Sequence, residues 1–367
     1  MLANFLVPLR DVERELNKHM KALQGAGSAP LQRARMSNLV IFCNSLESSI
    51  AVHEQVTNIT AVHPTRTILL VGEPGPDREL TSRVTVRPVG TGKQHVCVEM
   101  VTLHAGGGFV DRLPFAVRSL LIGDLPINVW WDAPIPPPFA GGLLHELGDT
   151  AQQIIYDSVG WPEPARGVSA TASWLEQMER PGGQWRVASD LNWRRLKHWR
   201  RLLTQALDES SAPGAIEAIR EIDIDHGPHT VVRAWMLASW LTRRLGWRVQ
   251  NGIVSPGFEM SWRFLTPRGE ARVRIRRIES DPPSIRRVRF ETVLDGRPVT
   301  VDVTPEGEET RRLVMKVEGA DVAPRTITVP PHNAVDLIGR QLSDRERDPA
   351  FRESMAVAQV MARSIHA

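Results

Sequence analysis

The sequence predicts an α/β domain, with a mostly parallel sheet and helices on both of its faces, followed by an α+β domain with an antiparallel sheet. Two continuous apolar runs of strand length, residues 38–43 and 67–71, predict the first domain because a helical pattern separates them. From residue 260 onward apolar and charged side chains alternate with period two. That alternation is typical of an antiparallel sheet with one solvated face.

The chain begins with a helical pattern over residues 9–24, which a stretch rich in Gly and Ala interrupts. This pattern predicts an N-terminal helical arm and linker over residues 1–30. A second helix is expected over 46–61, where Asn44 or Ser45 can accept hydrogen bonds from the first free amides. This helix joins two parallel strands, so we expect a right-handed crossover.

Four further segments complete the first domain, which we expect to span residues 31–165. They are a hairpin of strands 82–87 and 94–101 around Gly90–Gly92, a helix over 110–122, a strand over 124–131 and a strand over 153–157. The strand over 124–131 ends in Trp130 and Trp131, which point to opposite faces of a strand.

The second domain is expected over residues 166–367, with helices at both of its ends. Its elements are helices over 191–208 and 229–245, a hairpin of strands 287–294 and 298–304 around Asp295-Gly296, a strand over 313–317, and helices over 333–342 and 350–363. Asp190 is the expected N-cap of the helix over 191–208.

The composition is that of an ordinary globular protein, with 42% hydrophobic and 24% charged residues in 367. We expect a cytoplasmic protein outside the membrane: no apolar run approaches about 20 residues, no basic segment precedes the first apolar stretch, and two cysteines suit a reducing compartment. The net charge is +3, but acids and bases are interspersed, so we do not expect nucleic-acid binding.

No motif in the chain matches a known catalytic or cofactor-binding pattern. The turn after the first strand, Cys43–Glu47, holds no glycine, which argues against a dinucleotide. His226 and His229 lack further ligands nearby in the sequence, so no metal site is predicted. We therefore expect a binding or regulatory protein without a cofactor. Gly106–Gly108, which precedes a helix, and the clustered arginines leave open a sugar-phosphate-binding enzyme or a metabolite sensor.

Two sets of side chains are candidates for function. Tryptophan and arginine most often anchor protein interfaces, so the interface candidates are Trp130, Trp131, Trp193, Arg194 and Arg195. Burial in the core is the alternative for the tryptophans. Cys43 and Cys97 form a candidate redox pair, provided that their Cα atoms lie within about 7 Å.

Five segments in a fixed order together resemble the OpcA family, the assembly or activator proteins of glucose-6-phosphate dehydrogenase in cyanobacteria and actinobacteria. The segments are Ala61–Arg66 (AVHPTR), Leu120–Trp131 (LLIGDLPINVWW), Ile154–Ser158 (IIYDS), Ser189–Arg200 (SDLNWRRLKHWR) and Ala238–Trp247 (ASWLTRRLGW).

The resemblance implies a non-catalytic partner of glucose-6-phosphate dehydrogenase. Such a protein binds the dehydrogenase, promotes its active oligomer as an allosteric activator, and so supports the oxidative pentose phosphate pathway. In cyanobacteria the family is linked to thioredoxin control through cysteines, so thioredoxin is a second implied partner. The resemblance does not assign Cys43 or Cys97 to those cysteines.

Overall fold

The computed structural model describes most of the chain. The described residues are 6–26, 31–32, 34–89, 95–178, 186–207, 214–256, 259–279, 283–294, 296–307, 312–319, 321, 323–330 and 333–366. The predicted turn around Gly90–Gly92 and Asp295 of the second predicted turn lie outside them. Among the described residues, no helix has the length and apolar composition needed to cross a bilayer.

The chain forms two compact units, and neither is continuous in the sequence. The first contains Met1–Asp157, Pro181–Leu191 and Asn333–Arg347, and the second contains Ser158–Arg180, Asn192–His332 and Asp348–Ala367. The sequence suggested a single boundary near residue 165. The units interleave instead because the segment around residue 340 returns to the core of the first unit.

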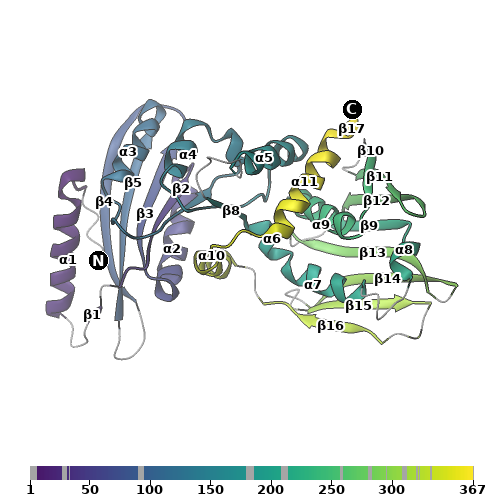
Figure 1. The fold of residues 1–367 in the computed structure, drawn as a ribbon. Helices are drawn as coiled ribbons and strands as arrows, with labels where there is room; N and C mark the ends of the chain where they lie inside the picture. Colours follow the sequence, from purple (N-terminus) through teal and green to yellow (C-terminus); the bar gives the residue numbers. More distant parts are fainter. Residues whose placement is uncertain are drawn as a thin grey trace. The chain divides into compact units, whose positions relative to one another are not determined.

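The first unit contains an eight-stranded sheet, sheet A, with its helices (Figure 1). Its strands are β1 (Leu31–Gln32), β2 (Ser37–Cys43), β3 (Thr65–Glu73), β4 (Arg78–Val89), β5 (His95–Gly106), β6 (Ile127–Asp132), β7 (Gln153–Tyr156) and β8 (Val187–Asp190). Its helices are η1 (Leu9–Asp11), α1 (Val12–Ala26), α2 (Leu46–Val62), η2 (Gly107–Arg112), α3 (Leu113–Arg118), η3 (Pro137–Phe139), α4 (Gly141–Gly148) and α10 (Ala334–Ser343).

Sheet A has the order β1-β5-β3-β2-β6-β7-β8, and all of these neighbours are parallel. The antiparallel strand β4 pairs with β5 as the predicted hairpin. Strand β2 is buried at each of its residues, which requires cover on both faces. The predicted class of the first domain is therefore confirmed.

One core of the first unit joins sheet A to α2 and α10. It combines side chains of the central strands with Val52, Val56 and Ile59 of α2 and with Leu337, Ile338 and Leu342 of α10. The sequence predicted both helices correctly, but assigned α10 to the second domain. Hydrophobic spacing defines the buried face of a helix and carries no information about which core receives that face.

The second unit contains a nine-stranded sheet, sheet B, in the order β16-β15-β14-β13-β9-β12-β11-β10-β17. Its strands are β9 (Glu221–His226), β10 (Arg248–Ser255), β11 (Glu259–Thr266), β12 (Gly269–Arg277), β13 (Ile285–Leu294), β14 (Arg297–Glu306), β15 (Arg312–Glu318), β16 (Arg325–Thr328) and β17 (Ile365–His366). Its helices are α5 (Pro164–Met178), α6 (Leu191–Arg195), α7 (Lys197–Ala206), α8 (Ala215–Ala218), α9 (Val231–Arg244) and α11 (Pro349–Arg363). The first residue of α6 belongs to the first unit.

Sheet B is mainly antiparallel, as predicted, and β9 lies at its centre. Strand β9 is parallel to β12 and antiparallel to β13. The helix expected over 191–208 forms as two helices, α6 and α7, which meet at Leu196. Asp190 ends β8 and directly precedes α6, as its predicted role requires.

The N-terminal helix α1 packs on sheet A and is not a detached arm. Its apolar side chains Val12, Leu16 and Met20 are buried, and the helix contacts β4. An ion-pair network holds the helix in place: Arg66 of β3, only 1% exposed, pairs with Glu13 of α1 at 2.5 Å and with the buried Glu99 at 3.4 Å. The sequence pattern showed the apolar stripe but not the buried partner.

We predict that Arg66→Met lowers the free energy of unfolding by about 3 kcal/mol, because Glu99 would lose one of its buried cationic partners. Urea unfolding followed by circular dichroism measures the change. The control is Glu13→Gln, whose carboxylate is half-exposed and whose loss should cost less than about 1 kcal/mol. Equal effects of the two substitutions would contradict a buried role for Arg66.

Candidate functional site

The carboxyl edge of sheet A is the place where an open α/β sheet usually holds its ligand. The strand order reverses at β2, because β3 lies on one side of it and β6 on the other. Cys43 ends β2 and Asp132 ends β6, so both side chains stand at this reversal point. The sequence pattern singled out Cys43 but not Asp132.

The amino terminus of α2, which follows β2, binds side chains of this chain. Ser45, one of the two predicted caps, accepts a hydrogen bond from the backbone N–H of Ser48 at 3.1 Å. Glu73, at the end of β3, lies near this terminus, because the backbone N–H of Leu46 is among the groups that lower the pKa of its carboxyl. In a dinucleotide-binding turn, glycines let the pyrophosphate approach such amides. Here the turn Cys43–Glu47 holds no glycine, and the Ser45 hydroxyl accepts the hydrogen bond from Ser48.

Two side chains of neighbouring strands contact Glu73. His104 of β5 lies 2.7 Å from its carboxylate, and Arg78 of β4 lies 3.3 Å away. The hydrogen bond with His104 is the main reason why the pKa of Glu73 is below its ordinary value. These contacts favour the ionised form of Glu73.

The glycine run Gly106–Gly108, the predicted alternative anion site, is also occupied by a carboxylate of the chain. The backbone N–H of Gly108 donates to Asp77 at 2.8 Å. Gly107 has a φ of +57°, and a Cβ added there would lie 2.3 Å from the same carboxylate. These glycines thus form a close contact with the turn between β3 and β4, in which Asp77 lies.

At the reversal point, the buried Cys43 lies beside Asp132, which is partly exposed. The sulfur of Cys43 lies 3.9 Å from a carboxylate oxygen of Asp132. Burial, followed by the negative charge of Asp157, raises the pKa of Asp132 to about 6. Burial, followed by the charge of Asp132, raises the pKa of the Cys43 thiol above its ordinary value. Cys43 is thus a neutral thiol at physiological pH and a poor nucleophile.

The donor set of this edge does not fit a dinucleotide or a sugar phosphate. Glu73, Asp77, Asp132 and Asp157 place carboxylates where a phosphate needs amides or cations. Among the described residues, no group of three or more His, Cys, Asp or Glu side chains could hold a metal ion. His226 is buried with Nδ1 2.7 Å from the carbonyl of Gly227, and burial lowers its pKa.

The three tryptophans among the interface candidates are core side chains. Trp130 and Trp131 are each 2% exposed, and Trp131 stacks on Phe42 with ring centroids 4.4 Å apart. Trp193 is also buried, and its indole N–H donates to Asp348 at 2.6 Å. The surface role expected for these indoles is therefore corrected to a core role, the alternative that the sequence left open.

The candidates Arg194 and Arg195 are partly exposed on α6. Arg195 donates to Asn192 at 3.2 Å, and the guanidinium of Arg200 lies 3.4 Å from the centre of the Trp193 ring. Burial, only partly offset by Asp348, lowers the pKa of Arg200 to about 10. The buried indole thus positions Arg200, on the helix that follows Arg194 and Arg195.

Cys43 and Cys97 do not form the predicted pair. Neither cysteine is in a disulfide and both are buried, and the strand registers align Cys43 with Val71 and Val71 with His104. Cys97 lies seven residues before His104 on β5, which is about 23 Å along a strand. A disulfide needs Cα atoms within about 7 Å, so this fold excludes the bond.

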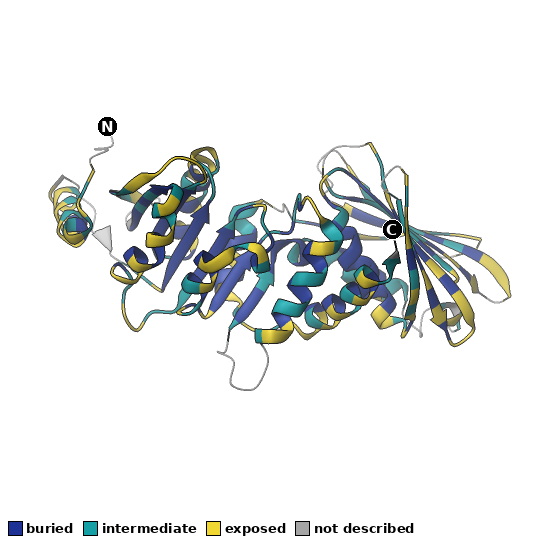
Figure 2. Ribbon diagram, turned by 90° about the horizontal axis from the view of Figure 1, so that it is seen from above, coloured by how far each residue is buried: buried dark blue, intermediate teal, exposed yellow. Residues whose placement is uncertain are grey.

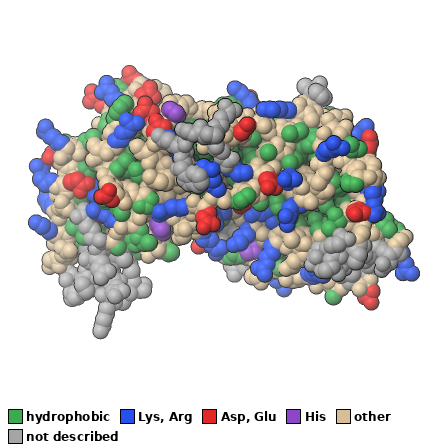
Figure 3. Space-filling model, viewed as in Figure 1, with side chains coloured by type: hydrophobic (Ala, Val, Ile, Leu, Met, Phe, Trp, Pro, Cys, Tyr) green, Lys and Arg blue, Asp and Glu red, His purple; other side chains and the backbone are tan. Residues whose placement is uncertain are grey.

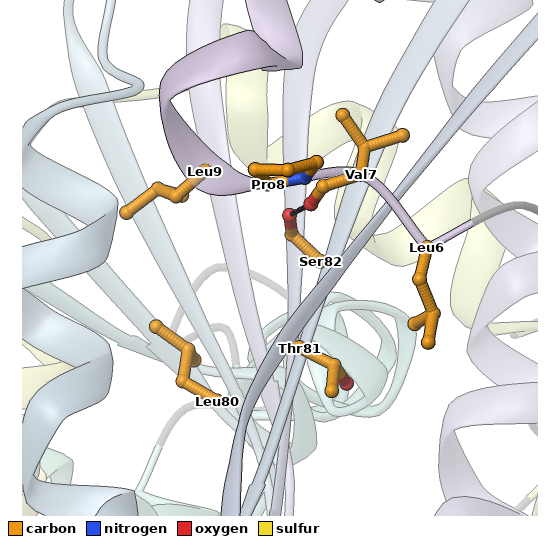
Figure 4. A pocket seen from close by; sticks show the side chains of 7 residues that line it. All are labelled: Leu6, Val7, Pro8, Leu9, Leu80, Thr81 and Ser82. Carbon is orange, nitrogen blue, oxygen red and sulfur yellow. Dashed lines mark hydrogen bonds between the residues drawn. The ribbon is translucent and has the colours of Figure 1, made fainter.

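A groove of about 280 Å³ lies where the N-terminal segment runs beside β4 (Figure 4). The backbone N–H of Val7 donates to the carbonyl of Ser82 at 2.9 Å. Leu9 and Leu80 line one side, and Leu6 lies on the other (Figure 4). No titratable side chain lines the groove, so its lining provides no acid, base or charged group.

Over the face shown in Figure 3, acidic and basic side chains are interspersed.

Two family models match the chain in order. One describes the N-terminal domain of a "Glucose-6-phosphate dehydrogenase subunit" and matches residues 56–173. The other describes the C-terminal domain of the same kind of protein and matches residues 186–355. Both carry the name OpcA.

Two relatives share the name OxPP cycle protein OpcA. The protein of Nostoc punctiforme is 31% identical over 153 residues, which cover 42% of this chain and 31% of the relative. The protein of Synechocystis is 28% identical over 202 residues, which cover 54% of this chain and 41% of the relative. The matches thus span less than half the length of each relative.

Solved structures with a similar arrangement have little sequence in common with the chain. A mutant of the 3-ketoreductase KijD10 from Actinomadura kijaniata is 9% identical, with a TM-score of 0.49 over 90% of this chain and 98% of that one. An oxidoreductase from Sinorhizobium meliloti is 11% identical, with a TM-score of 0.49 over 90% and 97%.

We predict that Asp132→Asn stabilises the protein at pH 8 by about 1–2 kcal/mol and has little effect at pH 4. Folding raises the pKa of Asp132, so the folded state binds the proton more tightly and loses stability as pH rises from about 4 through 6. The amide removes this loss. Urea unfolding at both pH values measures it, and a substitution that destabilises at pH 8 would contradict the assignment.

We predict that a thiol oxidant forms no disulfide within a folded chain, because Cys43 and Cys97 lie at opposite ends of their strands. After oxidation with diamide, the protein is unfolded with an alkylating reagent present and weighed by mass spectrometry. Two alkylated thiols per monomer are expected. A monomer two mass units lighter with no alkylation would contradict the register.

Proposed function

The chain belongs to the OpcA family of glucose-6-phosphate dehydrogenase subunits, and we propose that it is a non-catalytic factor that binds this dehydrogenase and promotes its active oligomer. The observation that carries the proposal is the ordered match of both family models, which together span most of the chain. In this proposal the protein acts in the cytoplasm, in support of the oxidative pentose phosphate pathway.

The carboxyl edge of sheet A supports a role without catalysis. Asp77 accepts a hydrogen bond from the amide of Gly108, so a carboxylate of the chain occupies one place where a phosphate would bind, and Glu73 adds a negative charge near the amino terminus of α2. A nearby thiol, Cys43, is neutral. A sugar-phosphate enzyme or metabolite sensor would need cationic or amide donors free at this edge. The geometry therefore favours the assembly factor over that alternative.

The mechanism in this proposal is linkage between binding and assembly. A partner that binds the active oligomer more tightly than the inactive form shifts the population toward the active oligomer by that difference in affinity. Such a partner needs a surface and no reaction chemistry. Arg194 and Arg195 are the contact residues we propose, because they are partly exposed on α6 and cationic.

Thioredoxin control, which the resemblance implies, would need a route other than an internal disulfide of this chain. Cys43 and Cys97 are both buried and far apart in sheet A. A mixed disulfide with another protein would require local opening of the sheet. We therefore propose the dehydrogenase as the main partner.

We predict that mixing the protein with the glucose-6-phosphate dehydrogenase of the same organism raises the rate of NADPH formation at sub-saturating glucose 6-phosphate. Light scattering on the same mixture should show a larger species of fixed stoichiometry. The double variant Arg194→Ala with Arg195→Ala should weaken the complex by about tenfold, because interface arginines are frequent hot spots.

The matched control is Arg166→Ala, which removes an exposed arginine of the same unit that pairs with Glu163, just before its own helix. A thermal-shift series with NADP, NAD and glucose 6-phosphate tests the alternative function on the isolated chain. No complex and no rate change at micromolar concentrations, together with a shift of several degrees for one ligand, would replace the assembly factor by the sensor.

A further inference from the structure

Among the described residues, helices α7, α9 and α11 lie on one face of sheet B, and charged side chains line much of the other face. Helices α9 and α11 contact β12 and β10, and α7 contacts β15; in Figure 2 these helices cover a single side of the sheet. The side of β12 that faces these helices carries the buried residues Ala271, Val273 and Ile275. The opposite side of β12 carries Arg272 and Arg274, with their side chains 53% and 28% exposed. We call this side the charged face of sheet B.

The charged face carries alternating charges across neighbouring strands. The strand registers align one row of side chains: Arg274 of β12, Asp223 of β9, Arg289 of β13, Asp302 of β14 and Lys316 of β15. The sign of the charge therefore changes at each step from β12 to β15. Opposite charges on directly opposed residues stabilise the sheet itself, and the same order also makes the row self-complementary.

Ion pairs within the sheet hold these side chains in place. Arg274 pairs with both oxygens of Asp223 at 2.8 Å, and Arg276 pairs with Asp225 at 3.0 and 3.2 Å. Arg287 reaches across to Asp302 at 2.5 Å. The charged face is thus a nearly neutral, pre-ordered surface, and little side-chain freedom would be lost if another surface covered it.

We propose that the charged face of sheet B binds the same face of a second copy of this chain, about a two-fold axis that runs parallel to the strands between β9 and β13. This operation places β9 opposite β13 of the second copy and β12 opposite β14. Asp223 then faces Arg289, and Arg274 faces Asp302, each with the opposite charge. A two-fold interface must be self-complementary, and the alternating row has that property.

Of the two neighbouring rows, one brings opposite charges together across this axis and the other brings like charges together. On one side of the middle row, Asp225 of β9 faces Arg287 of β13. On the other side, Glu221 faces Glu291, the one pair of like charges that the axis creates among these central strands. Arg272, next to Glu221, bonds that carboxylate at 2.8 Å and lessens the repulsion.

The size of the charged face suits a stable dimer. Seven strands from β10 to β15, about 4.8 Å apart, make a width of about 34 Å, and eight residues at about 3.3 Å make a length of about 26 Å. The product is roughly 900 Å², and a standard interface buries about 800 Å² on each partner. Exposed apolar side chains on this face, Ile253, Leu265 and Val293, add contacts that lose water on association.

The test uses two variants that exchange charges within neighbouring pairs. Variant A carries Asp223→Arg with Arg274→Asp, and variant B carries Arg289→Asp with Asp302→Arg. Each exchange keeps opposite charges within the exchanged pair but places like charges next to each other on β9 and β13 and across the two-fold axis. In a mixed dimer of A with B, all four of these contacts are again between opposite charges.

Sedimentation velocity from about 1 to about 100 µM measures the dimer, and circular dichroism confirms the fold. We expect a dimer for the natural sequence, dissociation constants at least about tenfold higher for A and for B alone, and recovery in an equimolar mixture. The control exchanges charges between Arg243 and Glu353, an ion pair of α9 and α11 away from this face, and should leave the dimer unchanged.

A monomeric natural protein at the highest of these concentrations would overturn the proposal, as would a mixture of A and B that stays monomeric. Variants that dimerise normally but no longer bind the dehydrogenase would assign the charged face to that partner instead. If A or B does not fold, the milder pair Arg289→Gln with Asp302→Asn provides the same test, and an unchanged dissociation constant would then overturn the proposal.

Discussion

The carboxyl edge of sheet A is governed by a simple requirement: the free amides at the start of a helix or turn need acceptors. In this chain the Ser45 hydroxyl accepts from Ser48 at the start of α2, and the Asp77 carboxylate accepts from Gly108 after β5. Because side chains of the chain satisfy these amides, the same amides are not available to an anionic ligand in this conformation.

Much of the fold is readable from the sequence because periodicity reports local structure. The apolar runs of β2 and β3, the crossover helix α2 with its Ser45 cap, and the alternating strands of sheet B all follow from it. The position of α10 does not, since the choice of core depends on contacts far apart in the chain. Neither does the place of β9 between β12 and β13, because strand pairing is not encoded in the pattern of a single strand.

The candidate site was harder to predict than the fold, because its contacts also join residues that are far apart in the sequence. The glycine-free turn after the first strand could be read from the sequence, because it is local. The contacts of Glu73 with His104 and of Asp77 with Gly108 depend on which strand ends and turns meet across the sheet. The tryptophans show the same limit. The sequence left open whether Trp130, Trp131 and Trp193 lie in an interface or in the core, and only the packing shows that they are buried. Charge alternation on sheet B needed the strand order, which no single segment contains.

The interleaving of the two units has a consequence for how the protein is made. A ribosome releases the chain from its N-terminus, so sheet A emerges long before Leu337, Ile338 and Leu342 of α10 can cover α2. Until synthesis has passed these residues, the apolar face of α2 lacks this cover. The nascent first unit is therefore the stage at which a chaperone would matter most, and a product truncated before α10 would expose that face permanently.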